Sequence, residues 1–202
     1  MFYDTRKNDH GLPHNPFKAI VAPRPIGWIT SMNTKGEINL APYSFFNGIT
    51  DKPPIVMFSS EGPKDSVAFV EETKEFVCSL ATFDLRDQMN GTSAPLPRGE
   101  SEMKATGLDP APSRLVKPPR VAASPCALEC QWIKTVGFDD VEGRKLDRYV
   151  VFGHVVGVYI DDRFIKNGRL DTAGMKPIAR CGYDEYAMVE SVFKMTRPKG
   201  GG

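Results

Sequence analysis

Long hydrophobic stretches are missing from this chain of 202 residues. A helix that crosses a bilayer needs roughly 20 consecutive apolar residues, and stretches such as Phe45–Phe46 or Val155–Val156 fall far short of that length. We therefore expect no membrane span. The opening residues carry charged side chains where a secretory signal would be apolar, so the sequence predicts a cytoplasmic protein.

An excess of charge of one sign is also missing. The 26 basic and 25 acidic side chains are scattered and give a net charge of +1, so no basic stripe suits a nucleic acid. The four cysteines are too few for a disulfide scaffold. Cys126 and Cys130 have a C-x3-C spacing, but the chain has only three histidines. We interpret these cysteines as two inward-facing residues of one strand and expect no metal site.

The two commonest nucleotide-binding motifs are absent as well. No Gly-x-Gly-x-x-Gly follows a predicted strand, and no Gly-x4-Gly-Lys-Ser/Thr occurs in the chain. Any nucleotide must therefore be held in another way.

Short segments rich in β-branched and aromatic residues dominate the sequence. They are Ile26–Ser31, Ile38–Leu40, Ser44–Thr50, Ile55–Ser59, Glu75–Ala81, Ala127–Val136 and Arg148–Ile160. Many short strands separated by turns favour a sandwich or barrel over a βαβ arrangement. With 41% hydrophobic residues, we expect one mainly β domain over residues 1–190 and a flexible tail over residues 191–202.

In the segment Val151–Ile160, both alternating sets of residues are largely apolar, so a strand here would have two apolar faces. Such a strand is expected to be central in the sheet or covered by a partner subunit. Helices are expected to be few and short, at Val67–Lys74 and Leu85–Asn90. Prolines and small residues dominate from Pro95 to Pro125, and we interpret this stretch as a surface excursion that covers one end of the barrel.

The most informative stretch runs from Ala22 to Ser66. A flavin mononucleotide (FMN) needs donors for its phosphate, partners for the polar edge of its ring and an apolar slot for the rest. Arg24 and Lys64 offer positive charge, and several hydroxyl groups lie near predicted strand ends and a helix start. Pro42 has no N–H group to donate to a neighbouring strand, so it suits an edge strand that faces a ligand. This stretch can meet all three needs.

The order of these pieces resembles the flavin reductase-like family, in particular its branch with flavoredoxins and the reductase component of nitrilotriacetate monooxygenase. The resembling pieces are Arg24-Pro25 leading to Thr30-Ser31, Asn39-Leu-Ala-Pro-Tyr-Ser44-Phe, Pro53-Pro-Ile-Val-Met-Phe-Ser59, Lys64-Asp65-Ser66 with Glu75-Phe76-Val77, and Pro177-Ile-Ala-Arg180-Cys-Gly182. They extend from about Phe17 to Tyr186. The chain departs from the commoner pattern at Cys181, where a second glycine often stands.

The resemblance implies a mainly β fold, a six-stranded antiparallel Greek-key split barrel with a few short peripheral helices. It also implies a homodimer with FMN near each subunit contact. The residues expected to bind the cofactor are Arg24, Thr30, Ser31, Asn39, Ala41, Pro42, Ser44, Ser59, Ser60, Lys64, Ser66 and Arg180.

The function implied is transfer of hydride from NAD(P)H to FMN, with the electrons passed to a partner oxygenase or another acceptor. A flavoredoxin-type electron carrier without NAD(P)H activity is the alternative, and a split-barrel binding module without flavin is a third. His154 is the candidate catalytic side chain, although a lone strand histidine is more often structural. Without a Rossmann motif, the sequence predicts no preference between NADH and NADPH.

Overall fold

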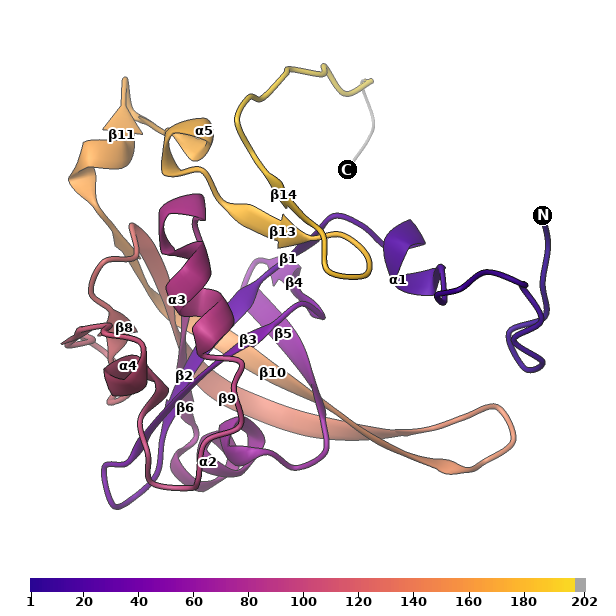
Figure 1. Ribbon diagram of the computed structural model, residues 1–202. Coiled ribbons are helices and arrows are strands. Elements are labelled where there is room, and N and C mark those ends of the chain that lie inside the picture. The colour runs from indigo at the N-terminus through magenta and orange to yellow at the C-terminus, as the bar shows by residue number, and fades with distance from the viewer. Residues whose placement is uncertain (199–202) are drawn as a thin grey trace.

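The computed structural model describes residues 1–198 and contains one large antiparallel sheet (Figure 1). In spatial order its strands are β3 (Ile38–Tyr43), β2 (Gly27–Met32), β6 (Glu75–Leu80), β9 (Cys126–Asp139), β10 (Lys145–Ile160), β5 (Pro54–Glu61) and β4 (Phe46–Asp51). They are the seven segments that composition predicts, one more than the family resemblance implies, because β4 pairs with β5 as an edge strand. The fold is a mainly β split barrel, as expected.

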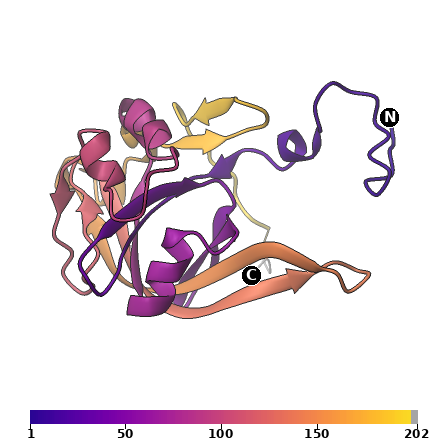
Figure 2. The ribbon, with the colours of Figure 1, turned by 60° about the horizontal axis from the view of Figure 1, so that its bottom comes forward.

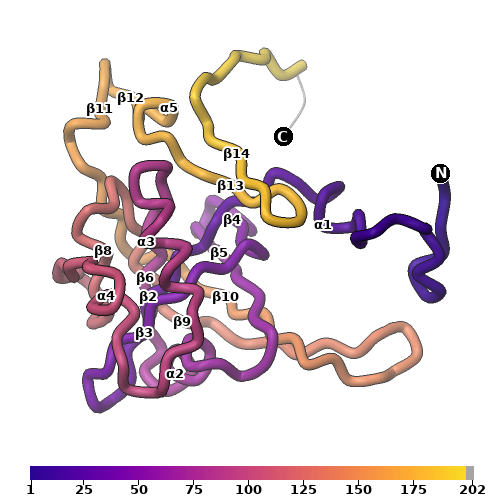
Figure 3. The backbone as a smooth tube through the Cα atoms, viewed as in Figure 1, coloured from indigo at the N-terminus to yellow at the C-terminus, as the bar shows by residue number. Residues whose placement is uncertain are grey.

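The sheet curls around one hydrophobic core. Buried side chains from strands far apart in the sheet, such as Ile29 of β2 and Phe58 of β5, belong to the same cluster. Helix α2 (Asp65–Thr73) covers one end of this core with Val67 and Val70. The crossing from β5 through α2 to β6 is easily followed in the backbone tube (Figure 3). A flat sheet could not bring these side chains together, so the strands form a barrel.

A second core lies on the outer face of β2 and β3. Trp28 and Leu40 are buried there beneath Met89 of α3 (Arg86–Gly91) and Met103 of α4 (Glu102–Ala105). The segment from Pro95 to Pro125 also contains β7 (Pro110–Ala111) and β8 (Arg120–Val121). This segment covers a face of the sheet and contributes buried side chains, so it is more than the surface excursion that its composition predicts.

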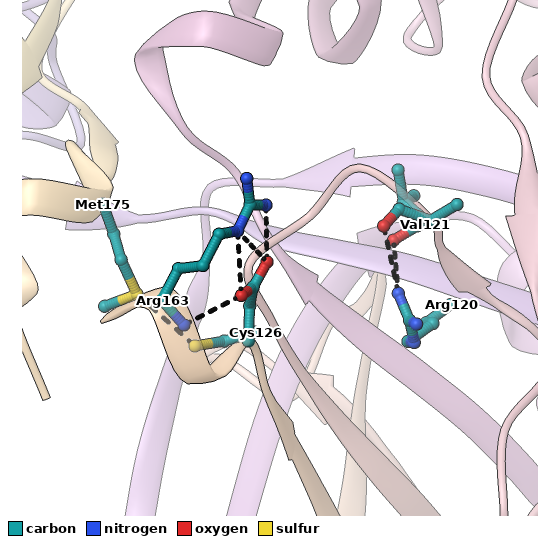
Figure 4. Close-up of polar contacts among 7 residues, drawn as sticks. Arg120, Val121, Cys126, Arg163 and Met175 are labelled. Atoms are coloured by element: carbon teal, nitrogen blue, oxygen red, sulfur yellow. Dashed lines mark hydrogen bonds and ion pairs between the residues drawn. The ribbon is translucent and has the colours of Figure 1, made fainter. Parts of the chain in front are cut away.

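Small elements complete the chain beyond the barrel. A three-stranded sheet contains β1 (Arg24–Pro25), β13 (Ile178–Arg180) and β14 (Tyr186–Met188), and α1 (Phe17–Ile20) precedes it. The others are η1 (Phe83–Leu85), η2 (Asp162–Phe164), β11 (Ile165–Lys166), β12 (Arg169–Leu170) and α5 (Thr172–Met175). Figure 4 shows Cys126 turned toward Met175, where Sγ donates to Sδ over 3.4 Å. Cys130 is buried in the barrel core. The sequence predicted that both cysteines of the C-x3-C pair would face inward, but only Cys130 packs in that core.

Two segments project from the same side of the barrel. The far half of the β9–β10 hairpin and the N-terminal residues both extend away from it (Figures 1 and 2). The hairpin carries exposed apolar side chains at Ile133, Phe138 and Leu146. Residues 191–198 contain no helix or strand, and the rest of the predicted tail, residues 199–202, lies outside the described residues. Over residues 1–198, we find no helix with the length and apolar character that a membrane crossing requires.

Candidate functional site

A pocket of about 450 Å³ opens between β3, the start of α2 and the loop that follows α3. Five of the cofactor-binding candidates line it. These are Asn39, Ala41, Pro42, Lys64 and Ser66. The other lining residues are Tyr43, Asp65, Thr92, Ser93, Ala94, Pro95, Leu96 and Glu102. Strand β3 is an edge of the sheet, so its outer backbone groups are not used by a neighbouring strand.

Buried polar side chains fix the inner wall of this pocket. Asn39 Nδ2 donates to Ser66 Oγ over 2.7 Å, which ties β3 to the first turn of α2. Burial raises the pKa of Tyr43, while hydrogen bonding to Ser66 and Ser60 opposes that shift. Ser60 Oγ donates to the carbonyl of Gly62 over 3.1 Å. Ser60 therefore belongs to the same polar network, one layer behind the pocket surface.

The start of α2 gives the pocket a positive end. The first N–H groups of a helix have no intrahelical acceptor and attract anions. Lys64 precedes this turn, is exposed, and forms no ion pair within residues 1–198. Asp65 is already engaged by Arg98, whose Nε donates to it over 2.9 Å. The local arrangement suits a phosphate group.

Glu102 closes the pocket from α4. Its side chain is almost fully buried, and Oε2 accepts the backbone N–H of Leu40 over 3.0 Å. Burial raises the pKa of this carboxyl group, and the hydrogen bond from Leu40 works in the opposite direction. Glu102 thus fastens the edge strand that forms the pocket wall.

Thr30 and Ser31 are fully buried on β2, and their hydroxyl oxygens lack a hydrogen-bond partner within the described residues. Ser31 lies opposite Asn39 across the β2–β3 ladder, so both side chains point to the same face. Thr30 points to the other face. Buried hydroxyl groups without a partner are uncommon in folded proteins, so both positions favour a role beyond packing.

The remaining candidates lie outside this pocket. Ser44 and Ser59 are half-buried, and the Ser59 N–H donates to the Phe45 carbonyl over 2.8 Å. The guanidinium carbon of Arg24 is 5.5 Å from the centre of the Phe45 ring. Arg180 lies directly opposite Arg24 in the β1–β13 pair. These four residues therefore form no part of the pocket lining.

His154 lies in the middle of β10, between Gln131 of β9 and Ile55 of β5. It is half-buried and is not among the pocket-lining residues. Sequence reasoning missed Glu102 and the loop Thr92–Leu96, which lie in or beside the proline-rich segment. The Thr92 hydroxyl, which accepts from the buried Trp28 indole over 2.9 Å, positions that loop. No local motif marks these residues.

The fold and the pocket define a split-barrel protein of the flavin reductase type. Residues 21–173 match the family described as the flavin reductase like domain, and the chain belongs to that family.

An uncharacterized protein from Aquifex aeolicus is 32% identical over 192 residues, which are 92% of this chain and 94% of that protein. Among solved structures, nitrilotriacetate monooxygenase component B from Bacillus cereus is 26% identical with a TM-score of 0.88, covering 96% of this chain and 98% of the other. A 2-nitrobenzoate 2-nitroreductase from Pseudomonas fluorescens is 26% identical with a TM-score of 0.85, covering 99% and 98%. Membership of the flavin reductase-like family supports binding of a flavin.

Proposed function

We propose that the protein is an FMN-binding oxidoreductase that passes hydride from NAD(P)H to FMN for a partner oxygenase or another acceptor. The observation that carries this proposal is the pocket between β3 and α2, which combines a positive end with a wall of small residues. Membership of the flavin reductase-like family supports it.

The donors around the pocket fit the parts of FMN. Lys64 and the first turn of α2 would bind the phosphate. Asn39 and Ser66, which already bond to each other, would face the ribityl chain. Ala41 and Pro42 leave room for a flat ring against an edge strand. The unpartnered hydroxyl of Ser31, on the face that Asn39 also uses, adds a donor whose function packing does not explain.

Bound FMN would supply the hydride-accepting chemistry, which no side chain can provide. The protein's own residues would position the ring, bind the phosphate and limit access of water to it. The half-buried His154 is not among the residues that line the pocket, so we assign it no proton transfer.

We extend the proposal to a homodimer. Exposed apolar side chains on the β9–β10 hairpin and on α1, including Phe138 and Ile20, would be covered by a second copy. A solved relative named as component B of a monooxygenase supports an oxygenase as the acceptor of the electrons.

The test is the visible spectrum of the purified protein, recorded anaerobically after addition of FMN and then of NADH or NADPH. We expect the protein to take up FMN, and we expect NADH or NADPH to bleach the absorption bands of the bound flavin. If the bound flavin bleaches only with a chemical reductant, the protein is an electron carrier and not a reductase. A protein that takes up no flavin would disprove both functions.

A further inference from the structure

The charged residues that line the candidate pocket do not by themselves favour an anion. Lys64 is basic, whereas Asp65 and Glu102 are acidic. Asp65 is the first residue of α2 and its side chain is only 25% exposed. Its carboxylate therefore lies at the same end of the helix that would bind the flavin phosphate, and two anions close together in a partly buried place repel each other strongly. A phosphate binds tightly there only if the charge of Asp65 is compensated.

Arg98 supplies that compensation. Its Nε donates to Asp65 Oδ1 over 2.9 Å, and its Nη2 donates to the same oxygen. This contact raises the pKa of Arg98, and the nearby charges of Glu37 and Glu72 act in the same direction. The Arg98 side chain is itself 64% exposed, and ion pairs so exposed contribute little to stability. The stability of the fold therefore does not explain why Arg98 is held beside Asp65.

A strap of residues 92–102 carries Arg98 to the start of α2. The strap runs from the end of α3 into α4 and forms one wall of the candidate pocket. Arg98 lies at its tip, in a tight turn in which the Glu100 N–H donates to the Pro97 carbonyl over 3.0 Å. The next residue, Gly99, has a φ of +94°, which favours glycine at this position of the turn. The local sequence thus builds a turn that presents the arginine.

Both ends of the strap are anchored by buried contacts. Near α3, the Thr92 hydroxyl accepts from the indole N–H of Trp28 over 2.9 Å. At α4, Glu102 Oε2 accepts from the Leu40 N–H over 3.0 Å. The tip of the strap, and the charge that it carries, is therefore placed by contacts at both ends and not by the exposed ion pair alone.

We propose that Arg98 makes the candidate pocket selective for a flavin that carries a phosphate, because it cancels the charge of Asp65 beside the phosphate position. Lys64 and the first turn of α2 then attract the phosphate without opposition. The inference rests on the proposed function, since the phosphate is that of FMN. Riboflavin has no phosphate, so its binding does not depend on the pair. Arg98 is a positioning residue in this assignment, because it acts on the ligand through Asp65.

The test uses a cycle of four proteins, which are the wild type, Arg98→Gln, Asp65→Asn and the double variant. The two side chains have a summed charge of zero in the wild type and in the double variant, whereas each single variant leaves one charge uncompensated. Quenching of flavin fluorescence measures the affinities for FMN and for riboflavin, at low and at high salt. Arg163→Gln is the matched control, because Arg163 pairs with Asp161 in a similarly exposed ion pair away from the pocket lining (Figure 4).

We expect Arg98→Gln to weaken FMN binding about tenfold at low salt, because Asp65 then repels the phosphate. Asp65→Asn should bind FMN more tightly than the wild type, and the double variant should recover the wild-type affinity. Riboflavin should bind equally well to all four proteins. The four FMN affinities should converge in about 1 M salt, where the screening length is about 3 Å. Arg163→Gln should match the wild type throughout.

Equal losses for FMN and riboflavin in Arg98→Gln would show that Arg98 only supports the strap, and would overturn the inference. A double variant as weak as Arg98→Gln would make Arg98 a direct ligand of the phosphate, which overturns it as well. If the wild type binds both flavins and Arg98→Gln binds FMN normally, the inference fails while flavin binding stands. A wild type that binds neither flavin disproves the proposed function and this inference together.

Discussion

The unpaired ammonium group of Lys64 is the single charge that the proposed phosphate position depends on most. Lys64→Gln should weaken FMN binding about tenfold, because a charge-assisted hydrogen bond is lost. Riboflavin, which lacks the phosphate, should bind equally well to both proteins. Titrations that follow quenching of flavin fluorescence measure both affinities. Lys35→Gln, in the exposed turn before β3, is the control. Equal losses for FMN and riboflavin would place the phosphate elsewhere.

Glu102 makes stability depend on pH in a predictable direction. Burial raises the pKa of its carboxyl group above the ordinary value of 4.5, so the folded protein holds this proton more tightly than the unfolded chain does. The contribution of Glu102 to the free energy of unfolding is therefore largest below pH 4.5 and falls as the pH rises through the folded-state pKa.

Glu102→Gln should remove that dependence while its amide oxygen still accepts the Leu40 N–H. Urea unfolding of both proteins from pH 4 to pH 8 checks the prediction, with the wild type losing stability relative to the variant as pH rises. Parallel curves would contradict it. Glu102→Ala should destabilise at every pH, by about 1–3 kcal/mol, since it leaves a backbone donor unpaired.

Sequence reasoning located part of the candidate site for a physical reason. Asn39, Ala41, Pro42, Lys64 and Ser66 lie in two short stretches, and the turn chemistry and the family pattern are visible within each stretch. Glu102 and Thr92 reach the pocket only through the packing of α3 and α4 on the outer face of β2 and β3. No periodicity in one segment encodes that contact, so the sequence could not predict it.

At the scale of the strand, β10 needs a glycine where it passes the core. A Cβ at Gly153 would lie 2.3 Å from Phe76 Cζ and 3.2 Å from Cys130 Cβ. Gly153→Ala should therefore lower the free energy of unfolding by about 1–3 kcal/mol through overpacking. Gly137, in the partner strand β9, has nothing within 4 Å of an added Cβ, and Gly137→Ala is the matched control. Thermal unfolding distinguishes them, and equal midpoints would refute the packing argument.

The strands differ in how well composition predicted them. All seven long strands were predicted, because each carries several β-branched or aromatic residues. Strands β1, β13 and β14 have two or three residues each, too few for an alternation to be visible. Their existence depends on tertiary pairing, and so does the meeting of Arg24 with Arg180.

For the whole molecule, the exposed apolar side chains of the β9–β10 hairpin predict self-association. Light scattering coupled to size-exclusion chromatography should give twice the mass of the chain. Phe138→Glu should shift the protein toward the monomer, because the substitution would bury a charge in the proposed interface. Lys166→Glu, on the short strand β11, should leave the mass unchanged. A monomeric wild type would refute the dimer.

The order of the strands also constrains how the chain can fold as it leaves the ribosome. β5 pairs with β10, which follows it only after α2, β6, α3, α4 and β9 have been made. Pairings between distant segments form slowly, because a long loop must first be closed. Ser60 and its neighbours in β5 therefore lack a partner strand on that edge until Arg148–His154 have been made. The residues that line the candidate pocket are all made once Glu102 has been added, whereas the strand behind them gains its second neighbour only after β10 has been made.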